Sequence, residues 1–219
     1  MTAARQAALF DLDGVLLDSA QAVRSTLAAV ATCATGRRVT PGDLPPDALC
    51  RPRCEVLALM DVDDPDDACD RWWDGAASVT AVEPFPGVLS GLLALRAQGT
   101  AIGAVTVQDP DRVRWLLPQA LSELLEVVIT RQDAPPKPAP DGLRLALSRL
   151  GVAPERAVFV GDSPSDMVAA HAASVVALGA VWGWHSPAAL RAAGADHLLP
   201  RPTSIGPPLL HHLPLIDSA

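Results

Sequence analysis

Short, almost uninterrupted apolar runs recur along the chain, and polar residues, glycine or proline bound each of them. The runs occupy residues 7–10, 100–106, 127–130, 157–160 and 175–178. Apolar runs of this length without polar alternation are typical of strands that are buried on both faces. We therefore predict an α/β fold with a doubly wound parallel sheet of the Rossmann-like kind.

Helical periodicity fills several segments between these runs. The apolar positions that share a helix face are Val88, Leu92, Leu93 and Leu95 in one segment and Leu143, Ala146, Leu147 and Leu150 in another. Gly99 and Gly151 follow these segments, and we expect them to end the two helices, because glycine readily adopts the left-handed conformation there. Alternation of strands and helices is what a parallel sheet requires.

The segment between the first two predicted strands is too long for one crossover helix. Apolar residues recur at helical spacing at Val23, Leu27, Val30 and Ala34. They follow the candidate capping residues Asp18 and Ser19, and no clear strand alternation precedes Val82. We predict a separate helical lid over residues 19–82, inserted into a core formed by residues 1–18 and 83–219.

The first predicted strand ends in two carboxylates one residue apart, Asp11 and Asp13, followed by Gly14. Side chains at positions i and i+2 of a strand share a face, so the two groups could converge on one hard cation. A calcium loop is excluded, because its fifth and sixth positions would be Val15 and Leu16 instead of a ligand and a glycine. An ordinary turn remains open as an alternative.

Two other predicted strands end in residues that suit phosphate or metal chemistry. The run 157–160 leads to Asp162 and, one turn into the following helix, Asp166. Asp166 could equally be a carboxylate that the helix dipole favours. Thr106 ends the second strand, where its hydroxyl could donate to a phosphate oxygen, although threonine is also common in strands.

Lys137 is the only lysine, and every other basic side chain is an arginine. It stands in the proline-rich stretch 134–140. A compact ammonium can reach a phosphate and a carboxylate together, where a planar guanidinium would not fit. We therefore interpret Lys137 as a candidate catalytic residue, the alternative being an ordinary surface lysine.

The composition of the chain bears on the size of its core and on the partners that it can bind. The chain has 219 residues, of which 49% are hydrophobic, enough for a sizeable core. Its formal net charge of −8 argues against nucleic acid or an anionic membrane as a partner. The first predicted strand begins close to Met1 and no apolar run reaches membrane-spanning length, so we expect a cytoplasmic protein.

The predicted lid carries all four cysteines, Cys33, Cys50, Cys54 and Cys69. Their spacing does not match paired zinc ligands, so we expect free thiols. An acidic run over residues 61–70 lacks the glycine of a calcium loop and is interpreted as a solvated loop and helix start. Arg51 and Arg53 are candidate substrate-binding residues of the lid, with ordinary surface arginines as the alternative.

The order and spacing of these segments resemble the haloacid dehalogenase superfamily of phosphotransferases. Residues 10–19 are similar to its nucleophile motif, Thr106 to its second motif, 137–138 to its third and 161–166 to its fourth. Residues 84–88, 137–142 and 181–187 resemble the phosphoglycolate phosphatase branch. One departure follows Thr106, where many relatives have Asn or Ser and then Lys, and this chain has Val107 and Gln108.

The resemblance implies a magnesium-dependent hydrolase of a small phosphorylated metabolite with an inserted helical cap. It implies that Asp11 attacks phosphorus to form an aspartyl-phosphate and that Asp13 acts as general acid and base. Mg²⁺ would bind the carboxylates of Asp11 and Asp162 and the backbone carbonyl of Asp13. Thr106 and Lys137 would hold the phosphoryl oxygens, with Gly14 and Asp166 in supporting roles. These supporting roles include orientation of Lys137 or of a metal-bound water by Asp166.

Other functions are weighed against the same residues. A dehalogenase has no use for Asp13, and a phosphonate hydrolase needs a lysine on the lid, which this chain lacks. A phosphomutase of the same superfamily uses the same four motifs and stays open. A non-catalytic regulator that binds a phosphorylated metabolite would be expected to lack a catalytic group, and none is missing.

Overall fold

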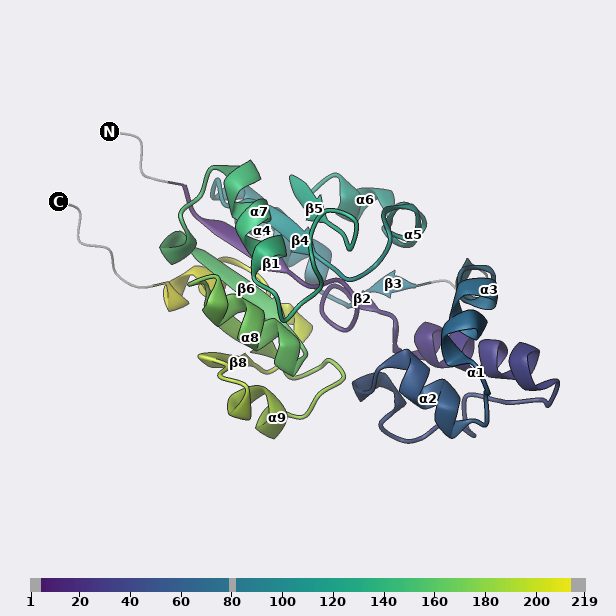
Figure 1. The fold of residues 1–219 in the computed structure, drawn as a ribbon. Coiled ribbons are helices and arrows are strands. Elements are labelled where there is room, and N and C mark those ends of the chain that lie inside the picture. Colours follow the sequence, from purple (N-terminus) through teal and green to yellow (C-terminus); the bar gives the residue numbers. More distant parts are fainter. Residues whose placement is uncertain (1–4, 79–81, 214–219) are drawn as a thin grey trace. The chain divides into compact units, whose positions relative to one another are not determined.

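The computed structural model describes residues 5–78 and 82–213. The chain divides into two compact units, one comprising residues 1–17 and 84–219 and the other residues 18–83. The first unit contains a β-sheet and the second is helical (Figure 1). Parts of the predicted lid (residues 79–81) and of the chain's beginning (residues 1–4) lie outside the described residues.

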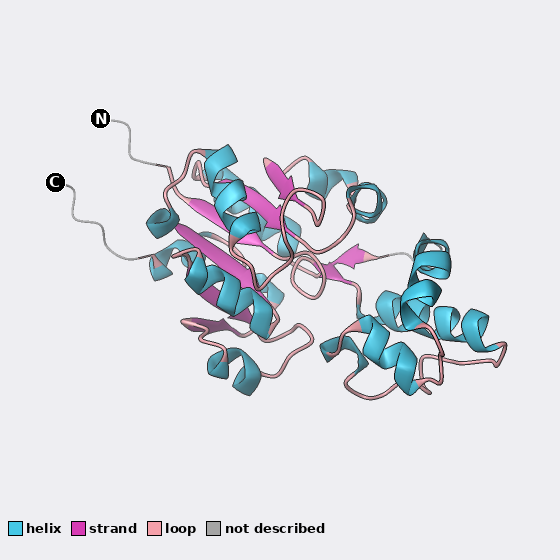
Figure 2. Ribbon diagram, in the orientation of Figure 1, coloured by secondary structure: helices cyan, strands magenta, loops and turns pink. Residues whose placement is uncertain are grey.

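The sheet unit contains six parallel strands in the order β5-β4-β1-β6-β7-β8 (Figure 2). The strands are β1 (Ala7–Phe10), β4 (Ala101–Val105), β5 (Val127–Ile129), β6 (Ala157–Gly161), β7 (Val176–Ala180) and β8 (His197–Leu199). All residues of β1, β4 and β6 are buried, which explains their nearly continuous apolar sequences. The predicted α/β class with a doubly wound parallel sheet is confirmed.

Three strands escaped the sequence analysis. β8 is short, lies at the sheet edge and is only partly buried, so it carries no long apolar run. β2 (Leu17–Asp18) and β3 (Glu83–Pro84) form a separate two-stranded sheet. Two-residue strands are too short to show any alternation of polar and apolar side chains.

Helices and short 3₁₀ helices lie between the strands of the sheet unit and after the last of them. The helices are α4 (Val88–Ala97), α5 (Pro110–Leu116), α6 (Gln119–Ser122), α7 (Asp141–Leu150), α8 (Pro164–Ala172) and α9 (Pro187–Ala192). The 3₁₀ helices are η2 (Pro154–Arg156), η3 (Pro202–Ser204) and η4 (Pro207–His212). Gly151 follows α7 and Gly99 follows the C-cap residue Gln98 of α4, and both glycines have the positive φ expected at a helix end, 66° and 76°.

The core of the sheet unit lies between the strands and these helices. Leu9 of β1 and Phe159 of β6 belong to one buried cluster with Leu143 and Leu147 of α7 and Met167 of α8. Leu9 pairs in register with Phe159 on one side and with Gly103 of β4 on the other. This packing fixes the ends of the three central strands relative to one another.

The helical unit has its own core. It contains α1 (Ala20–Thr35), η1 (Ala48–Cys50), α2 (Arg53–Leu59) and α3 (Pro65–Ser78). Leu27 and Val30 of α1 are buried with Val56 of α2 and Trp73 of α3. The helical periodicity that begins at Val23 therefore marks a true buried face. In the part of the chain that the structure describes, no helix combines the length and apolar character that crossing a bilayer requires.

The strand order reverses direction at the centre of the sheet. From β1 the chain proceeds to β4 and β5 on one side and then returns to β6, β7 and β8 on the other. In doubly wound sheets the crevice beyond the carboxyl ends of the strands at such a reversal is where ligands bind. The residues that directly follow β1 and β6 are Asp11 and Asp162.

Candidate active site

A tight loop after β1 presents Asp11 and Asp13. The Asp11 backbone N–H donates to the Val160 carbonyl at 2.9 Å, which extends the pairing of β1 with β6 by one residue. The Leu12 carbonyl then accepts N–H groups from residues 15, 16 and 17 at 2.9–3.3 Å. Gly14 has a φ of 75°, a conformation that other residues rarely adopt, so glycine permits this turn.

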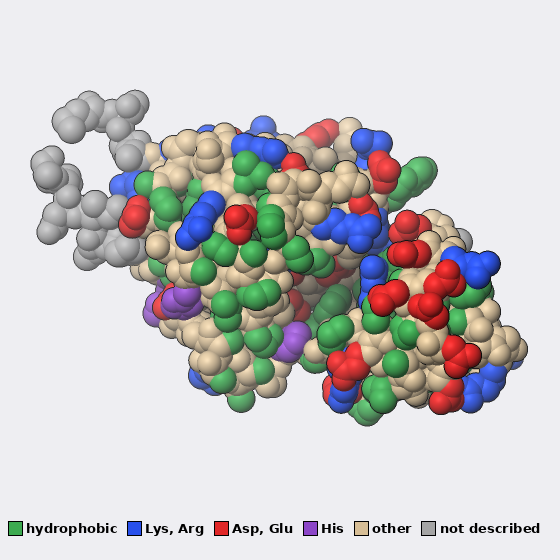
Figure 3. Space-filling view, viewed as in Figure 1, with side chains coloured by type: hydrophobic (Ala, Val, Ile, Leu, Met, Phe, Trp, Pro, Cys, Tyr) green, Lys and Arg blue, Asp and Glu red, His purple; other side chains and the backbone are tan. Residues whose placement is uncertain are grey.

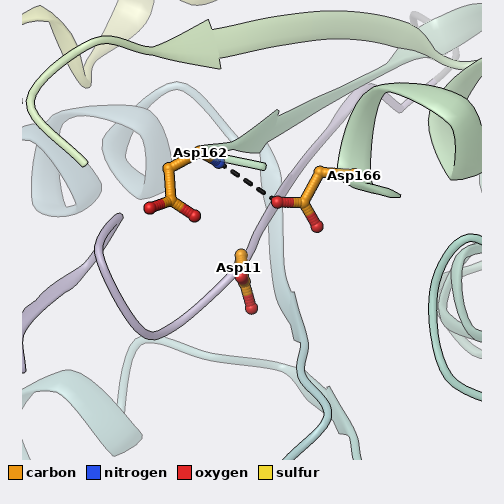
Figure 4. Close-up of side chains that lie close together, drawn as sticks. All are labelled: Asp11, Asp162 and Asp166. Atoms are coloured by element: carbon orange, nitrogen blue, oxygen red, sulfur yellow. Dashed lines mark hydrogen bonds between the residues drawn. The ribbon is translucent and has the colours of Figure 1, made fainter. Parts of the chain in front are cut away.

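Three carboxylates converge at the ends of β1 and β6. One oxygen from each of Asp11, Asp162 and Asp166 lies within 4.8 Å of the others (Figure 4). Asp162 and Asp166 are almost fully buried, and the Asp11 side chain is 14% exposed. Buried carboxylates at such short separations repel one another, so they require a compensating positive charge.

Lys137 supplies part of that charge. Its Nζ lies 3.0 Å from Asp11 Oδ1 and 2.6 Å from Asp166 Oδ1, and its side chain is only 6% exposed. The alternative of a surface lysine is therefore wrong. The ammonium bridges the carboxylate that follows β1 and the one on the first turn of α8.

Asp166 has two structural roles. Its Oδ2 accepts the N–H groups of Asp162 and Ser163 at 3.1 and 3.0 Å, and Ser163 Oγ accepts the Asp166 N–H in return, which forms a capping box. Its Oδ1 pairs with Lys137. Asp166 is thus both the helix-start carboxylate and an ion-pair partner of Lys137.

The loop after β7 fixes Asp162. The Trp184 backbone N–H donates to Asp162 Oδ2 at 2.7 Å. A Cβ at Gly183 would lie 2.2 Å from Asp162 Cβ, and one at Gly14 would lie 2.3 Å from Asp162 Oδ2, so both positions need glycine. Trp182 Nε1 also donates to the Val15 carbonyl at 3.2 Å and ties this loop to the one after β1. The sequence analysis quoted this segment only for its resemblance and assigned it no role.

Asp13 is not one of the three clustered carboxylates, and its side chain bonds to Gln108. Its side chain is buried, and its Oδ2 accepts a hydrogen bond of 2.6 Å from Gln108 Nε2. Thr106 is buried at the end of β4, where its Oγ1 accepts the Gln108 N–H at 3.2 Å. The sequence analysis noticed Gln108 only as a departure from a motif, and nothing in the sequence connected it with Asp13.

Burial and charge shift the ionisation of the cluster. Burial raises the pKa of Asp11 to about 7, against the lowering effect of the Lys137 ammonium and with smaller contributions from Asp166 and Asp13. Burial, followed by the charges of Asp11 and Asp166, raises the pKa of Asp162 well above its ordinary value. Burial alone would lower the pKa of Lys137, but Asp11 and Asp166 together raise it above its ordinary value. Three carboxylates with a single ammonium leave an excess of negative charge.

The cluster fits a hard metal ion. Carboxylate oxygens are the ligands that Mg²⁺ and Ca²⁺ prefer, and a bound dication would offset the charge that raises the pKa of Asp11 and Asp162. The cluster contains the two carboxylates expected to bind the metal, Asp11 and Asp162, and one more. Asp166 lies in the cluster, whereas the Asp13 carboxylate bonds to Gln108. The expected contribution of Asp13 was its backbone carbonyl, which stays a prediction.

The two lid arginines have partners within the helical unit. Arg51 pairs with Asp47 at 2.8 Å and with Glu55, and the Arg53 guanidinium lies 5.0 Å from the centre of the Trp73 ring. The role of both in substrate binding stays a prediction. Figure 3 shows acidic side chains spread over the visible face of this unit, with basic ones among them.

No disulfide links the four cysteines, all of which lie within the described residues. The Cys54 thiol donates to Asp66 at 3.0 Å, and this hydrogen bond together with burial raises the pKa of Cys54 to about 11. A thiol with such a pKa is mostly protonated near neutral pH and therefore a weak nucleophile.

The fold and the cluster together define an α/β protein with a buried acidic site at the switch point of a parallel sheet. Residues 8–180 match the family model of the haloacid dehalogenase-like hydrolases. A phosphoglycolate phosphatase from Xylella fastidiosa (strain 9a5c) is 33% identical over 189 residues, which cover 81% of each chain. The chain therefore belongs to the haloacid dehalogenase-like hydrolases.

Solved structures agree with this assignment. A putative phosphoglycolate phosphatase from Lactobacillus plantarum has a TM-score of 0.77 and 26% identity, covering 93% of this chain and 98% of that one. A putative β-phosphoglucomutase from Thermotoga maritima has a TM-score of 0.73 and 25% identity, covering 95% and 100%. Further curated relatives named phosphoglycolate phosphatase align over 118 residues, 53% of this chain and 46% of their own length. The expected family and enzyme class, a hydrolase of the phosphatase type, are confirmed.

Proposed function

We propose that this protein is a magnesium-dependent phosphatase that hydrolyses a small phosphate monoester through an aspartyl-phosphate on Asp11. The observation that carries the proposal is the contact of Lys137 Nζ with both Asp11 and Asp166, beside Asp162, at the carboxyl ends of β1 and β6. A nucleophilic carboxylate, a buried cation and an acidic metal site within one crevice are what transfer of an anionic phosphoryl group requires.

The metal would be held by the carboxylates of Asp11 and Asp162 and by the backbone carbonyl of Asp13. When bound, Mg²⁺ offsets negative charge on the phosphoryl group and the nucleophile, so that two anions can approach. The hydrogen bond from Trp184 to Asp162 Oδ2 leaves Asp162 Oδ1 as the oxygen without this backbone donor.

The chain's own residues account for the two chemical steps. In the first, an oxygen of Asp11 attacks phosphorus, the bond to the leaving oxygen breaks, and Asp13 donates its proton to that oxygen. In the second, Asp13 takes a proton from a water molecule that attacks the phosphorus of the aspartyl-phosphate and releases inorganic phosphate. Lys137 and Thr106 hold the phosphoryl oxygens, and Asp166 orients Lys137.

The helical unit is proposed to cover the site and to bind part of the substrate. Residues 19–82 would act as a lid that excludes bulk water during the reaction, and Arg51 and Arg53 would bind the part of the substrate beyond its phosphate. The names of the relatives favour a small carboxylate phosphate such as phosphoglycolate, or a sugar phosphate. We propose a cytoplasmic location for an enzyme of this kind.

A phosphomutase is the second candidate, because a neighbour of similar fold is described as a putative β-phosphoglucomutase. Such an enzyme returns the phosphoryl group from the aspartate to a bound sugar phosphate and depends on a bisphosphate. A regulator that only binds the metabolite has less support, because Asp11, Asp13, Lys137 and Asp162 are all present.

Phosphate release from a panel of small phosphate monoesters, with Mg²⁺ and with excess chelator, tests the proposal. We expect release that requires Mg²⁺ and is concentrated on a few esters. Asp11→Asn is the control, since it keeps the size of the side chain but removes the nucleophile, and should lower turnover by at least about 10³-fold. Wild-type turnover in this variant would contradict the covalent mechanism. A requirement for bisphosphate in converting one sugar phosphate to another would favour the phosphomutase.

A further inference from the structure

Gln108 is the nearest polar partner that the structure gives to Asp13. It follows β4, one strand away from the loop that carries Asp13, and its Nε2 lies 2.6 Å from Asp13 Oδ2.

The backbone of Gln108 is anchored on both sides. Its N–H donates to Thr106 Oγ1 at 3.2 Å, and its carbonyl accepts the Arg131 N–H at 3.2 Å. The next residue, Asp109, accepts a hydrogen bond of 2.9 Å from Gln132 Nε2 and pairs with the Arg131 guanidinium. The loop after β4 is therefore attached to the loop after β5, and the side chain of Gln108 projects from a fixed backbone.

The two oxygens of Asp13 have different surroundings. Oδ2 accepts the hydrogen bond from Gln108, whereas Oδ1 is buried and has no hydrogen-bond partner among the described residues. Burying a carboxylate oxygen without a hydrogen bond costs free energy unless a substrate or a water molecule donates to it. One oxygen is thus held in place, and the other is left open for proton transfer.

We propose that Gln108 is a positioning residue that holds the Asp13 carboxyl group in the orientation needed to protonate the leaving oxygen. This role rests on the proposed phosphatase function. A carboxamide suits it, because Nε2 can donate to Oδ2 whether or not Oδ1 carries a proton. The same side chain therefore keeps a bond to Asp13 before and after the proton is transferred.

The dependence on the leaving group tests this role. An alkoxide is a poor leaving group and needs a proton from Asp13, whereas 4-nitrophenolate departs without one. The measurement is kcat/KM, which covers only the steps up to release of the alcohol or phenol. It is made with 4-nitrophenyl phosphate and with the alkyl phosphate that the wild-type protein hydrolyses fastest.

Gln108→Met keeps the length of the side chain and removes its hydrogen-bonding groups. We expect it to lower kcat/KM by at least about tenfold for the alkyl phosphate and by less than about threefold for 4-nitrophenyl phosphate. The carboxamide of Gln108→Asn is too short to reach Asp13, so this variant should also lose more kcat/KM with the alkyl phosphate than with 4-nitrophenyl phosphate. It replaces Gln108→Met in the test if the Met variant does not fold.

Gln132→Met is the matched control, since it removes another glutamine bond to a carboxylate, the one from the loop after β5 to Asp109, without contact to Asp13. It should lower both kcat/KM values equally or not at all. An equal loss on both esters in the Gln108 variants, or no loss, would overturn the positioning role while the wild-type activity upholds the phosphatase. Release of phosphate from neither ester by the wild-type protein would overturn the proposed function and this role with it.

Discussion

At the scale of single residues, the site depends on how one ammonium is shared between two carboxylates. Lys137 contacts Asp11 and Asp166, and its Nζ also lies 5.4 Å from the centre of the Phe159 ring. An arginine would place a wider, planar group in a space already bounded by buried side chains. The positive charge of Lys137 also offsets part of the repulsion between the carboxylates of Asp11, Asp162 and Asp166.

Replacement of Lys137 should therefore affect catalysis strongly. We expect Lys137→Arg and Lys137→Met to lower kcat for a phosphate monoester by at least about 100-fold, since the charge proposed to hold the phosphoryl oxygens is misplaced or lost. Steady-state kinetics with saturating Mg²⁺ measures this, and far-ultraviolet circular dichroism checks that the variants fold. Arg144→Met, which removes an exposed cation on α7, is the control. Full activity of Lys137→Arg would contradict the assigned role.

Some of these residues could be predicted from sequence and others could not. Asp11, Lys137 and Asp162 stand at strand ends or in a rigid proline-rich segment, so local pattern alone indicated them. The partner of Asp13 could not be predicted, because Gln108 is 95 residues away in sequence and meets it only through the packing of β4 beside β1.

At the scale of elements, the segment after β5 determines where Lys137 lies. The Thr130 N–H and hydroxyl donate to Asp133 Oδ2 at 3.0 and 2.8 Å, and Arg149 of α7 donates to Asp133 Oδ1 at 3.0 Å. These bonds close a turn directly before residues 134–137. The bonds from Thr130, ahead of the smaller contribution of Arg149, lower the pKa of Asp133 below its ordinary value.

This turn should contribute a pH-dependent part of the stability. Because the folded-state pKa of Asp133 is depressed, its contribution is present above the unfolded-state pKa near 3.8 and is lost as the pH falls through the lower folded-state pKa. We expect Asp133→Asn to lower the free energy of unfolding by up to about 1 kcal/mol at pH 7, since solvent screens this exposed position. The difference from wild type should shrink below about pH 4.

Urea unfolding between pH 3 and pH 7 measures the effect. Asp111→Asn is the control, because Asp111 is largely exposed and pairs with Arg114 only at 3.6 Å. A constant difference between wild type and Asp133→Asn over the whole pH range would show that the ionised carboxylate contributes nothing specific.

Element prediction succeeded where burial was complete. β1, β4 and β6 are buried along their whole length, so their sequences contain little but apolar residues. β8 exposes His197 and stays short at the sheet edge, where tertiary pairing with β7 and not composition makes it a strand. The loop 181–185 has no secondary structure of its own, and its function follows only from its contacts with Asp162 and Val15.

At the scale of the whole molecule, two separate hydrophobic cores stabilise the two units. The core around Leu9 and Phe159 belongs to the sheet unit, and the core around Leu27 and Trp73 belongs to the helical unit. The acidic cluster lies wholly in the sheet unit. Metal binding to that cluster should therefore stabilise one unit directly.

Hydrogen exchange of the backbone amides should show whether Mg²⁺ stabilises the sheet unit more than the helical unit. We expect Mg²⁺ at about 100 times its dissociation constant to stabilise the folded state against unfolding by about 2.7 kcal/mol. Amide exchange around Asp11 and Asp162 should become slower. Exchange in α1 and α3 should change much less. Asp162→Asn should abolish the effect, and equal protection of both units in the wild-type protein would contradict a site confined to the sheet unit.

The solitary lysine has a further chemical consequence. With Lys137 buried between two carboxylates, the only side-chain amine of the protein is shielded from acylating reagents and is held in its protonated, unreactive form. Modification of that amine by a lysine-directed reagent would require the ion pairs to separate and the side chain to become exposed. The rate at which Lys137 is acylated would therefore measure how often its amine becomes exposed, and no engineered label is needed.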